Sequence, residues 1–251
     1  MKKKMKKVIV GGAVILCSGV AGTAGAAAIT WDTIHNSSST ADNCSSGAGN
    51  SCTFNKGGEI LQARAYATNN DSGSGAFKKA TINVFDGGGI GVKNPDQSAE
   101  NNSPHHAVDS NGRDDMVVFE YDNSTYDPTG FMIGWKSGDA DIRAWFGGEN
   151  LAAGYDFTGK RFSDLSGLGF TLFNFNNVSI NTLMSFNTDL TGRYLILAPQ
   201  LYNTQGYDKH YDYFKISQIS GTTTVTVPEP GTAALLGIAL AGLLANRRRK
   251  S

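Results

Sequence analysis

Apolar and polar residues alternate in Ala80-Thr81-Ile82-Asn83-Val84, and this pattern decides the fold class. Side chains of a β-strand point alternately to its two faces, so the alternation predicts a strand with one face buried. The stretch Tyr213-Phe214-Lys215-Ile216-Ser217 has the same period and places Phe214 and Ile216 on one face. A Thr-rich run at 222–224 follows it, and we expect this run to be a spacer.

Similar short runs recur through the middle of the chain, where Gly, Asn and Asp separate them. No helical period stands out between these runs. Many short strands in one domain predict an all-β fold, an antiparallel β-sandwich of jelly-roll-like type, with an open Greek-key barrel as the alternative. The expected strands lie at 59–68, 77–86, 116–122, 131–136, 141–146, 169–175, 193–198 and 213–219.

The 251 residues suffice for one large or two small domains, and the formal net charge of zero hides an uneven distribution. Nine of the 22 basic residues lie in the two end segments, 1–26 and 227–251, whereas Glu229 is the one acid there. Residues 27–226 therefore hold 13 basic and 21 acidic residues, a net charge of about −8. Such an acidic domain is not expected to bind nucleic acid.

The first 26 residues have the parts of a secretory signal peptide. Five lysines precede an apolar run at 8–20, and small residues follow, with A-x-A patterns at 24–26 and 26–28. We expect cleavage after Ala26 or Ala28, which makes 1–26 the signal peptide and 27–226 the surface domain. A retained N-terminal anchor is the alternative, which the short apolar run disfavours.

Two cysteines remain after such cleavage, Cys44 and Cys52, in a stretch rich in Gly, Ser and Asn. Exported proteins meet an oxidising environment, in which nearby cysteines form disulfides. We expect a Cys44–Cys52 bridge that stabilises the fold by roughly 2 to 3 kcal/mol. Two free thiols are the alternative.

The C-terminal segment 227–251 has three parts in a fixed order. Pro228, Glu229 and Pro230 come first, an apolar run at 232–245 follows, and the basic residues Arg247, Arg248, Arg249 and Lys250 come last. As a helix the run would be about 21 Å long, shorter than the roughly 30 Å hydrocarbon core of a membrane. The basic end would stay in the cytoplasm. This arrangement resembles the PEP-CTERM sorting signal of Gram-negative bacteria, and an ordinary tail anchor is the alternative.

The resemblance implies a route for the protein. PEP-CTERM signals are read by an exosortase in the inner membrane, so this chain would be the substrate of that enzyme. Export through the secretion translocon, transient anchoring in the inner membrane by the C-terminal transmembrane helix, and release to the cell surface or extracellular matrix would follow. The expected role is structural or adhesive, in contact with exopolysaccharide or within a biofilm.

An acidic loop precedes the strand expected at 116–122, and a second acidic pair follows the strand at 131–136. Ca²⁺ takes about six to eight oxygen ligands. If those strands are neighbours, both loops lie at one end of the sheet. A calcium site is predicted at Asp109, Asn111, Asp114, Asp115, Asp139 and Asp141, and a turn whose side chains cap backbone groups is the alternative. We expect His105 and His106 to be ordinary loop residues.

Aromatic residues in a polar loop favour carbohydrate binding, because rings pack against sugar faces. Trp135 and Trp145 lie within expected strands and are expected to be mostly buried. The predicted glycan contacts are therefore Tyr202, Tyr207 and Tyr211. A calcium-stabilised carbohydrate-binding module is the first alternative function.

Catalytic motifs are weak between residues 27 and 226. That region has only four glutamates, and no motif pairs them as acid and base. It also lacks a Gly-x-Ser-x-Gly elbow between a strand and a helix. We predict that the protein is not an enzyme and that calcium is its one candidate cofactor. A secreted polysaccharide hydrolase is the second alternative.

Overall fold

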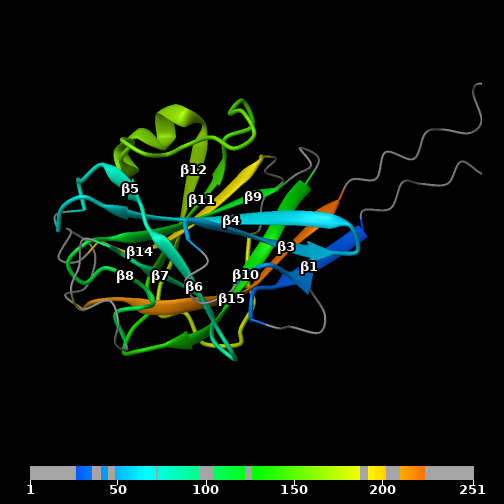
Figure 1. Ribbon diagram of the computed structural model, residues 1–251, viewed down its shortest axis with the longest axis horizontal. Coiled ribbons are helices and arrows are strands. Elements are labelled where there is room, and N and C mark those ends of the chain that lie inside the picture. Colours follow the sequence, from blue (N-terminus) through cyan, green and yellow to red (C-terminus); the bar gives the residue numbers. More distant parts are fainter. Residues whose placement is uncertain are drawn as a thin grey trace, which may run out of the picture. The chain divides into compact units, whose positions relative to one another are not determined.

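The computed structural model describes residues 27–35, 41–44, 49–71, 73–95, 104–121, 126–186, 192–201 and 210–223. All of them belong to one unit, Ala26–Val225. They form two antiparallel β-sheets that pack face to face, with two short 3₁₀ turns (Figure 1). The predicted all-β antiparallel sandwich is therefore confirmed.

The seven-stranded sheet draws strands from both halves of the chain. Its strands are β1 (Ala27–Asp32), β6 (Thr81–Phe85), β7 (Gly89–Lys93), β8 (Val108–Asp109), β10 (Tyr126–Lys136), β13 (Met184–Ser185) and β15 (Tyr213–Thr223). They run in the order β13-β10-β15-β7-β6, and β1 and β8 also pair with β15. The first strand lies beside the last, because Ala27 pairs with Thr223.

The eight-stranded sheet supplies the other layer. Its strands are β2 (Ala41–Asp42), β3 (Ser51–Lys56), β4 (Glu59–Thr68), β5 (Phe77–Lys79), β9 (Asp115–Tyr121), β11 (Ile142–Gly147), β12 (Phe170–Phe175) and β14 (Tyr194–Pro199). They run in the order β12-β11-β14-β9-β4-β3-β2, and β5 pairs with β4. β12 thus lies at one edge of this sheet, beside β11.

Large apolar side chains fill the space between the sheets. Val117 and Phe119 of β9 and Leu195 and Leu197 of β14 belong to this core, and all four are fully buried. Removal of apolar surface from water is the main force that holds the two layers together, at about 25 cal/mol per Å².

The outer face of the eight-stranded sheet is also covered. The segment 148–169, with the 3₁₀ turns η1 (Phe162–Asp164) and η2 (Ser166–Leu168), lies over this face, and Figure 1 shows the turns above β11 and β12. A second apolar cluster fills the space beneath, and its members include Met116, Val118, Tyr194, Ile196, Phe157, Phe162 and Leu165. Because both faces of β9 and β14 are buried, the stretches 116–119 and 194–198 are unbroken apolar runs and do not alternate.

Most predicted strands have the expected positions. The strands predicted at 59–68, 116–122, 141–146, 169–175 and 193–198 agree with β4, β9, β11, β12 and β14 to within one residue at each end. β10 begins at Tyr126, earlier than expected, and β15 continues to Thr223. The interpretation of Thr222 and Thr223 as a spacer was therefore wrong, because both pair with β1 and β10.

The strand predicted at 77–86 is two strands in different sheets. β5 pairs with β4 in the eight-stranded sheet, whereas β6 pairs with β7 in the seven-stranded sheet. The chain crosses between the layers at Ala80, whose N–H donates to Ala65 O at 3.0 Å. Strands that change sheets at a corner are common in sandwiches, and sequence alternation does not reveal such a corner.

β7 was not predicted, because two of its five residues are glycines and strand propensity is low there. The structure gives the reason for Gly91. A Cβ atom at this position would collide with the carbonyl oxygen of His106. The close approach of residues 106 and 107 to β7 therefore requires glycine.

Candidate binding pocket

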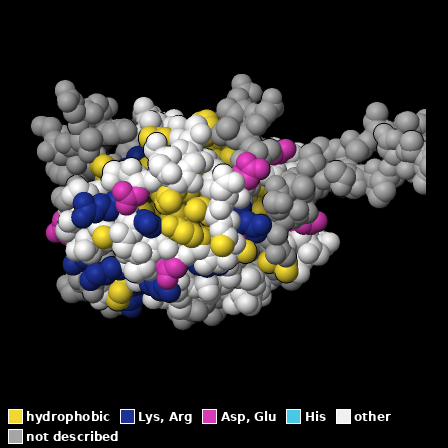
Figure 2. Space-filling model, turned by 90° about the horizontal axis from the view of Figure 1, so that it is seen from above, with side chains coloured by type: hydrophobic (Ala, Val, Ile, Leu, Met, Phe, Trp, Pro, Cys, Tyr) yellow, Lys and Arg dark blue, Asp and Glu magenta, His cyan; other side chains and the backbone are white. Residues whose placement is uncertain are grey.

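A pocket of about 500 Å³ opens where η1 and η2 approach β11 and β12. This volume lies in the usual range for small-ligand sites, roughly 300 to 1,000 Å³. Figure 2 looks onto this side of the molecule and shows hydrophobic side chains with basic and acidic ones around them. We call it the outer pocket, and its lining residues are Gly73, Ser74, Arg143, Trp145, Arg161, Phe162, Ser163, Ser166, Phe170, Leu172 and Leu201.

The floor of the outer pocket is a guanidinium packed on aromatic rings. Arg143 and Trp145 are alternate residues of β11, so both side chains lie on the outer face of the sheet. The Trp145 ring stacks on Phe162 with centroids 5.2 Å apart. The Arg143 Cζ lies 4.9 Å from the Trp145 centroid and 4.2 Å from the Phe162 centroid, and its Nε donates to Pro199 O at 2.8 Å. These contacts hold the Arg143 charge in one place.

The rim carries the more accessible groups. Arg161, Ser163 and Ser166 are exposed, and Leu172 is 44% exposed. The backbone N–H of Arg161 donates to Asp164 Oδ2 at 2.9 Å, which caps η1 beside the pocket. The rim therefore offers one cation, hydroxyl groups and an apolar surface to a ligand.

Asp114 lies directly behind one wall of the outer pocket. Gly73 has a φ of 67°, and a Cβ atom at this position would collide with Leu201 and lie 3.1 Å from Asp114 Oδ2. Asp114 is 3% exposed, and its Oδ2 makes no hydrogen bond within the described part of the chain. Burial raises the pKa of this carboxyl to about 7, although the charge of Arg143 opposes the shift.

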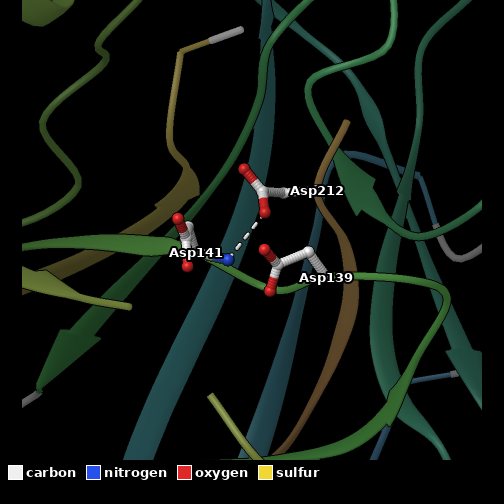
Figure 3. A group of neighbouring side chains, drawn as sticks. All are labelled: Asp139, Asp141 and Asp212. Carbon is white, nitrogen blue, oxygen red and sulfur yellow. Dashed lines mark hydrogen bonds between the residues drawn. The ribbon is translucent and has the colours of Figure 1, made fainter. Parts of the chain in front are cut away.

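A second group of polar side chains consists of Asp139, Asp141 and Asp212. Each offers a carboxylate oxygen, and these oxygens lie within 4.8 Å of one another (Figure 3). Asp212 Oδ1 accepts from the backbone N–H of Asp141 at 2.6 Å, and Asp141 Oδ1 accepts from that of Asn177 at 2.6 Å. Asp139 and Asp212 also form a parallel β-bridge. The carboxylates therefore hold the loop after β10 against the start of β15.

The residues predicted to bind calcium do not form one cluster. Asp109 Oδ1 accepts from the N–H of Asn111 at 2.9 Å, and Asp115 Oδ2 accepts from the N–H of Asp109 at 3.4 Å. This loop adjoins Asp212, because Ser110 N–H donates to Asp212 O at 3.2 Å. Asp114, however, lies behind the outer pocket. The described carboxylates close enough to share an ion are Asp139, Asp141 and Asp212, so calcium binding stays a prediction with a changed set of residues.

The aromatic residues fall into two groups. Trp135 is half-buried and Trp145 is 5% exposed, as expected for strand residues. Tyr211 is 40% exposed, whereas Tyr202 and Tyr207 lie outside the described residues. A glycan contact of these tyrosines stays a prediction. His105 packs edge-on against Tyr213, and His106 packs against Phe85.

Cys44 and Cys52 are joined by a disulfide in the structure, with Cα atoms 5.1 Å apart. Both residues belong to the core between the sheets. The bridge links the segment after β2 to β3. Its oxidation in the exported protein stays a prediction.

Residues 226–250 match the family model described as the PEP-CTERM protein-sorting motif. The chain carries a PEP-CTERM sorting motif. The match includes all the predicted sorting residues, Pro228, Glu229, Pro230, Arg247, Arg248 and Arg249. The motif implies export in a Gram-negative bacterium, transient anchoring in the membrane and processing by an exosortase. The chain has no significant match among curated proteins or solved structures.

The predicted signal peptide at 1–26, the PEP-CTERM residues and the apolar run at 232–245 lie outside the described residues. Within the described ranges, no helix is long and apolar enough to cross a membrane.

Three residues of these sites were missed from the sequence. Arg143 lies within a predicted strand, where its neighbour Trp145 was assigned to the core. Arg161 and Asp212 belong to segments without a motif. Arg143 and Asp212 carried no signal, because Phe162, Pro199 and Asp141 lie far from them along the chain.

Proposed function

We propose that the exported sandwich is a structural or adhesive protein of the cell surface or extracellular matrix that holds polysaccharide in the outer pocket. The PEP-CTERM motif supports the route to the surface. The outer pocket carries the rest of the proposal, because its lining combines apolar, hydroxyl and cationic groups.

The lining suits a sugar ring. Phe170 and Leu172 offer apolar surface for the C–H groups of a pyranose, and Ser163 and Ser166 offer hydroxyls for hydrogen bonds. The floor is pre-organised by the Trp145–Phe162 stack, so little conformational entropy is lost when a ligand binds. Both properties favour the recognition of carbohydrate.

Binding without hydrolysis is the form of the proposal that the lining supports. Glycosidases place two carboxyl groups on opposite sides of the scissile bond. The described lining of the outer pocket contains no Asp or Glu. Glu120 is one of the four glutamates in the domain. It lies outside the outer pocket, and its Oε2 is 2.7 Å from Arg64 Nη1.

The test is affinity electrophoresis of the full chain, purified in detergent, through gels that contain polysaccharide extracted from the matrix of the producing cells. Ser166→Trp places a large ring at the exposed rim of the outer pocket, and Ser179→Trp places the same ring on an exposed site outside it. We expect the polysaccharide to retard the wild type and Ser179→Trp, but not Ser166→Trp. Equal retardation of all three proteins, or of none, would contradict the proposal.

A further inference from the structure

The outer pocket is cationic in an acidic domain. Residues 27–226 have a net charge of about −8 by sequence. The described residues that line the pocket nevertheless include Arg143 and Arg161 and no carboxylate. At long range the domain repels an anion, so two arginines in one pocket indicate a ligand whose negative charge is recognised at close range.

The two arginines have different tasks. Arg143 is 4% exposed, and its guanidinium is held by Trp145, Phe162 and the carbonyl of Pro199. It supplies a positive charge at the floor, which Asp114 behind the wall partly offsets when it is ionised. Arg161 is exposed at the rim, so its guanidinium can reach a ligand and bind a carboxylate through two parallel hydrogen bonds.

We propose that the outer pocket selects sugar residues that carry a carboxylate, such as uronic acids, and that Arg161 is the contact for this carboxylate. The inference rests on the proposed function, because it takes the ligand to be a saccharide. The serine hydroxyls and the apolar wall at Leu172 would contact the ring, while Arg161 would contact the acid group. A small inorganic anion would bind the positive charge of Arg161 but would not contact the apolar wall at Leu172.

The test is isothermal titration of the full chain, in detergent, with trigalacturonic acid and with the same trisaccharide after its carboxyl groups are reduced to alcohols. We expect the reduction to weaken binding to the wild type at least tenfold. Arg161→Gln should weaken binding of the acid form by a similar factor and remove the difference between the two ligands. Arg161→Lys should keep part of the preference, because the charge stays and the two-pronged geometry is lost.

Lys136→Gln is the matched control, because it removes one positive charge from β10 in the other sheet. It should leave both affinities unchanged.

Equal affinity of the wild type for both trisaccharides would overturn the carboxylate inference and leave the proposed polysaccharide function standing. Binding of neither trisaccharide would overturn the inference, and the electrophoresis with matrix polysaccharide would then decide the proposed function separately. Displacement of trigalacturonic acid by an equal concentration of inorganic phosphate would also overturn it, since the site would then recognise charge alone.

Discussion

Trp145 of β11 and Phe162 of η1 stack with their rings 5.2 Å apart and their planes 16° apart. The contact joins the eight-stranded sheet to the segment that covers it. Arg143 packs against both rings, so the same contact also shapes the floor of the outer pocket. Stability of the cover and the shape of the outer pocket therefore both depend on one aromatic pair.

Replacement of Phe162 by alanine should destabilise the sandwich. The change removes the stack on Trp145 and an edge contact with Phe77 at 4.8 Å, and Phe162 is 8% exposed. We expect a loss of about 3 kcal/mol in the free energy of unfolding, measured by urea titration with tryptophan fluorescence. Leu172→Ala, on an exposed side chain of the same pocket, should cost less than about 1 kcal/mol. Similar losses in both variants would contradict this role for the aromatic pair.

Asp114 should make the protein less stable as the pH rises. Its pKa is raised by burial to about 7 in the folded state, from 3.8 in the unfolded chain. Between these values the folded state binds more protons than the unfolded state, so stability falls from about pH 4 to about pH 7. Asp114→Asn, which cannot ionise, should gain stability over the wild type across this window, by at most about 4 kcal/mol at pH 8. The charged groups that influence Asp114 are Arg143 and Asp71.

Asp156→Asn is the control for that experiment because the pKa of Asp156 is shifted the other way. Hydrogen bonds from Thr158, followed by the interaction with Lys79, lower the pKa of this carboxyl. Its stabilising effect is present above the unfolded pKa of 3.8 and is lost as the pH falls. The variant should therefore be slightly less stable than the wild type at pH 8. A pH-independent gain in Asp114→Asn would show that burial of its charge is not the cause.

Asp212 should contribute to stability through the backbone groups that it holds. Asp212→Ala leaves the buried N–H of Asp141 without its acceptor, and we expect a loss of about 1 to 3 kcal/mol. Asp212→Asn keeps an oxygen acceptor and should lose less stability.

Thermal unfolding with calcium and with a chelator tests the calcium prediction. A melting temperature that calcium raises in the wild type, but not in Asp212→Asn, would support it, whereas no response in the wild type would contradict it.

The PEP-CTERM residues should control processing. Replacement of Pro228, Glu229 and Pro230 by alanine should leave unprocessed protein in the inner membrane, because the exosortase would lack its recognition motif. Intact mass of the protein from the membrane and from the cell surface is the measurement, in cells with and without exosortase. Alanine at Thr224, which precedes the matched residues, should leave processing unchanged. Surface delivery and mature mass like those of the wild type in the triple variant would refute the assignment.

Local patterns account for most of the strands. β4 was predicted with its observed bounds, Glu59–Thr68, and four further strands were placed to within one residue, because turn residues bound their apolar runs. Local patterns failed where pairing depends on distant segments. Gly91 lies in a strand because β7 is paired with β6 on one side and with β15 on the other, although glycine is a poor strand former.

The amino-acid sequence by itself determined the PEP-CTERM motif and the all-β class, because each is a pattern of neighbouring residues. The signal peptide at 1–26 stays a prediction. Only the tertiary structure decided the sites. Arg143 meets Phe162 because the segment after β11 folds back over the sheet, and Asp212 meets Asp141 because β15 returns beside β10. These contacts depend on the strand order and on the packing of the two layers. Both are determined by the burial of apolar surface over the whole domain.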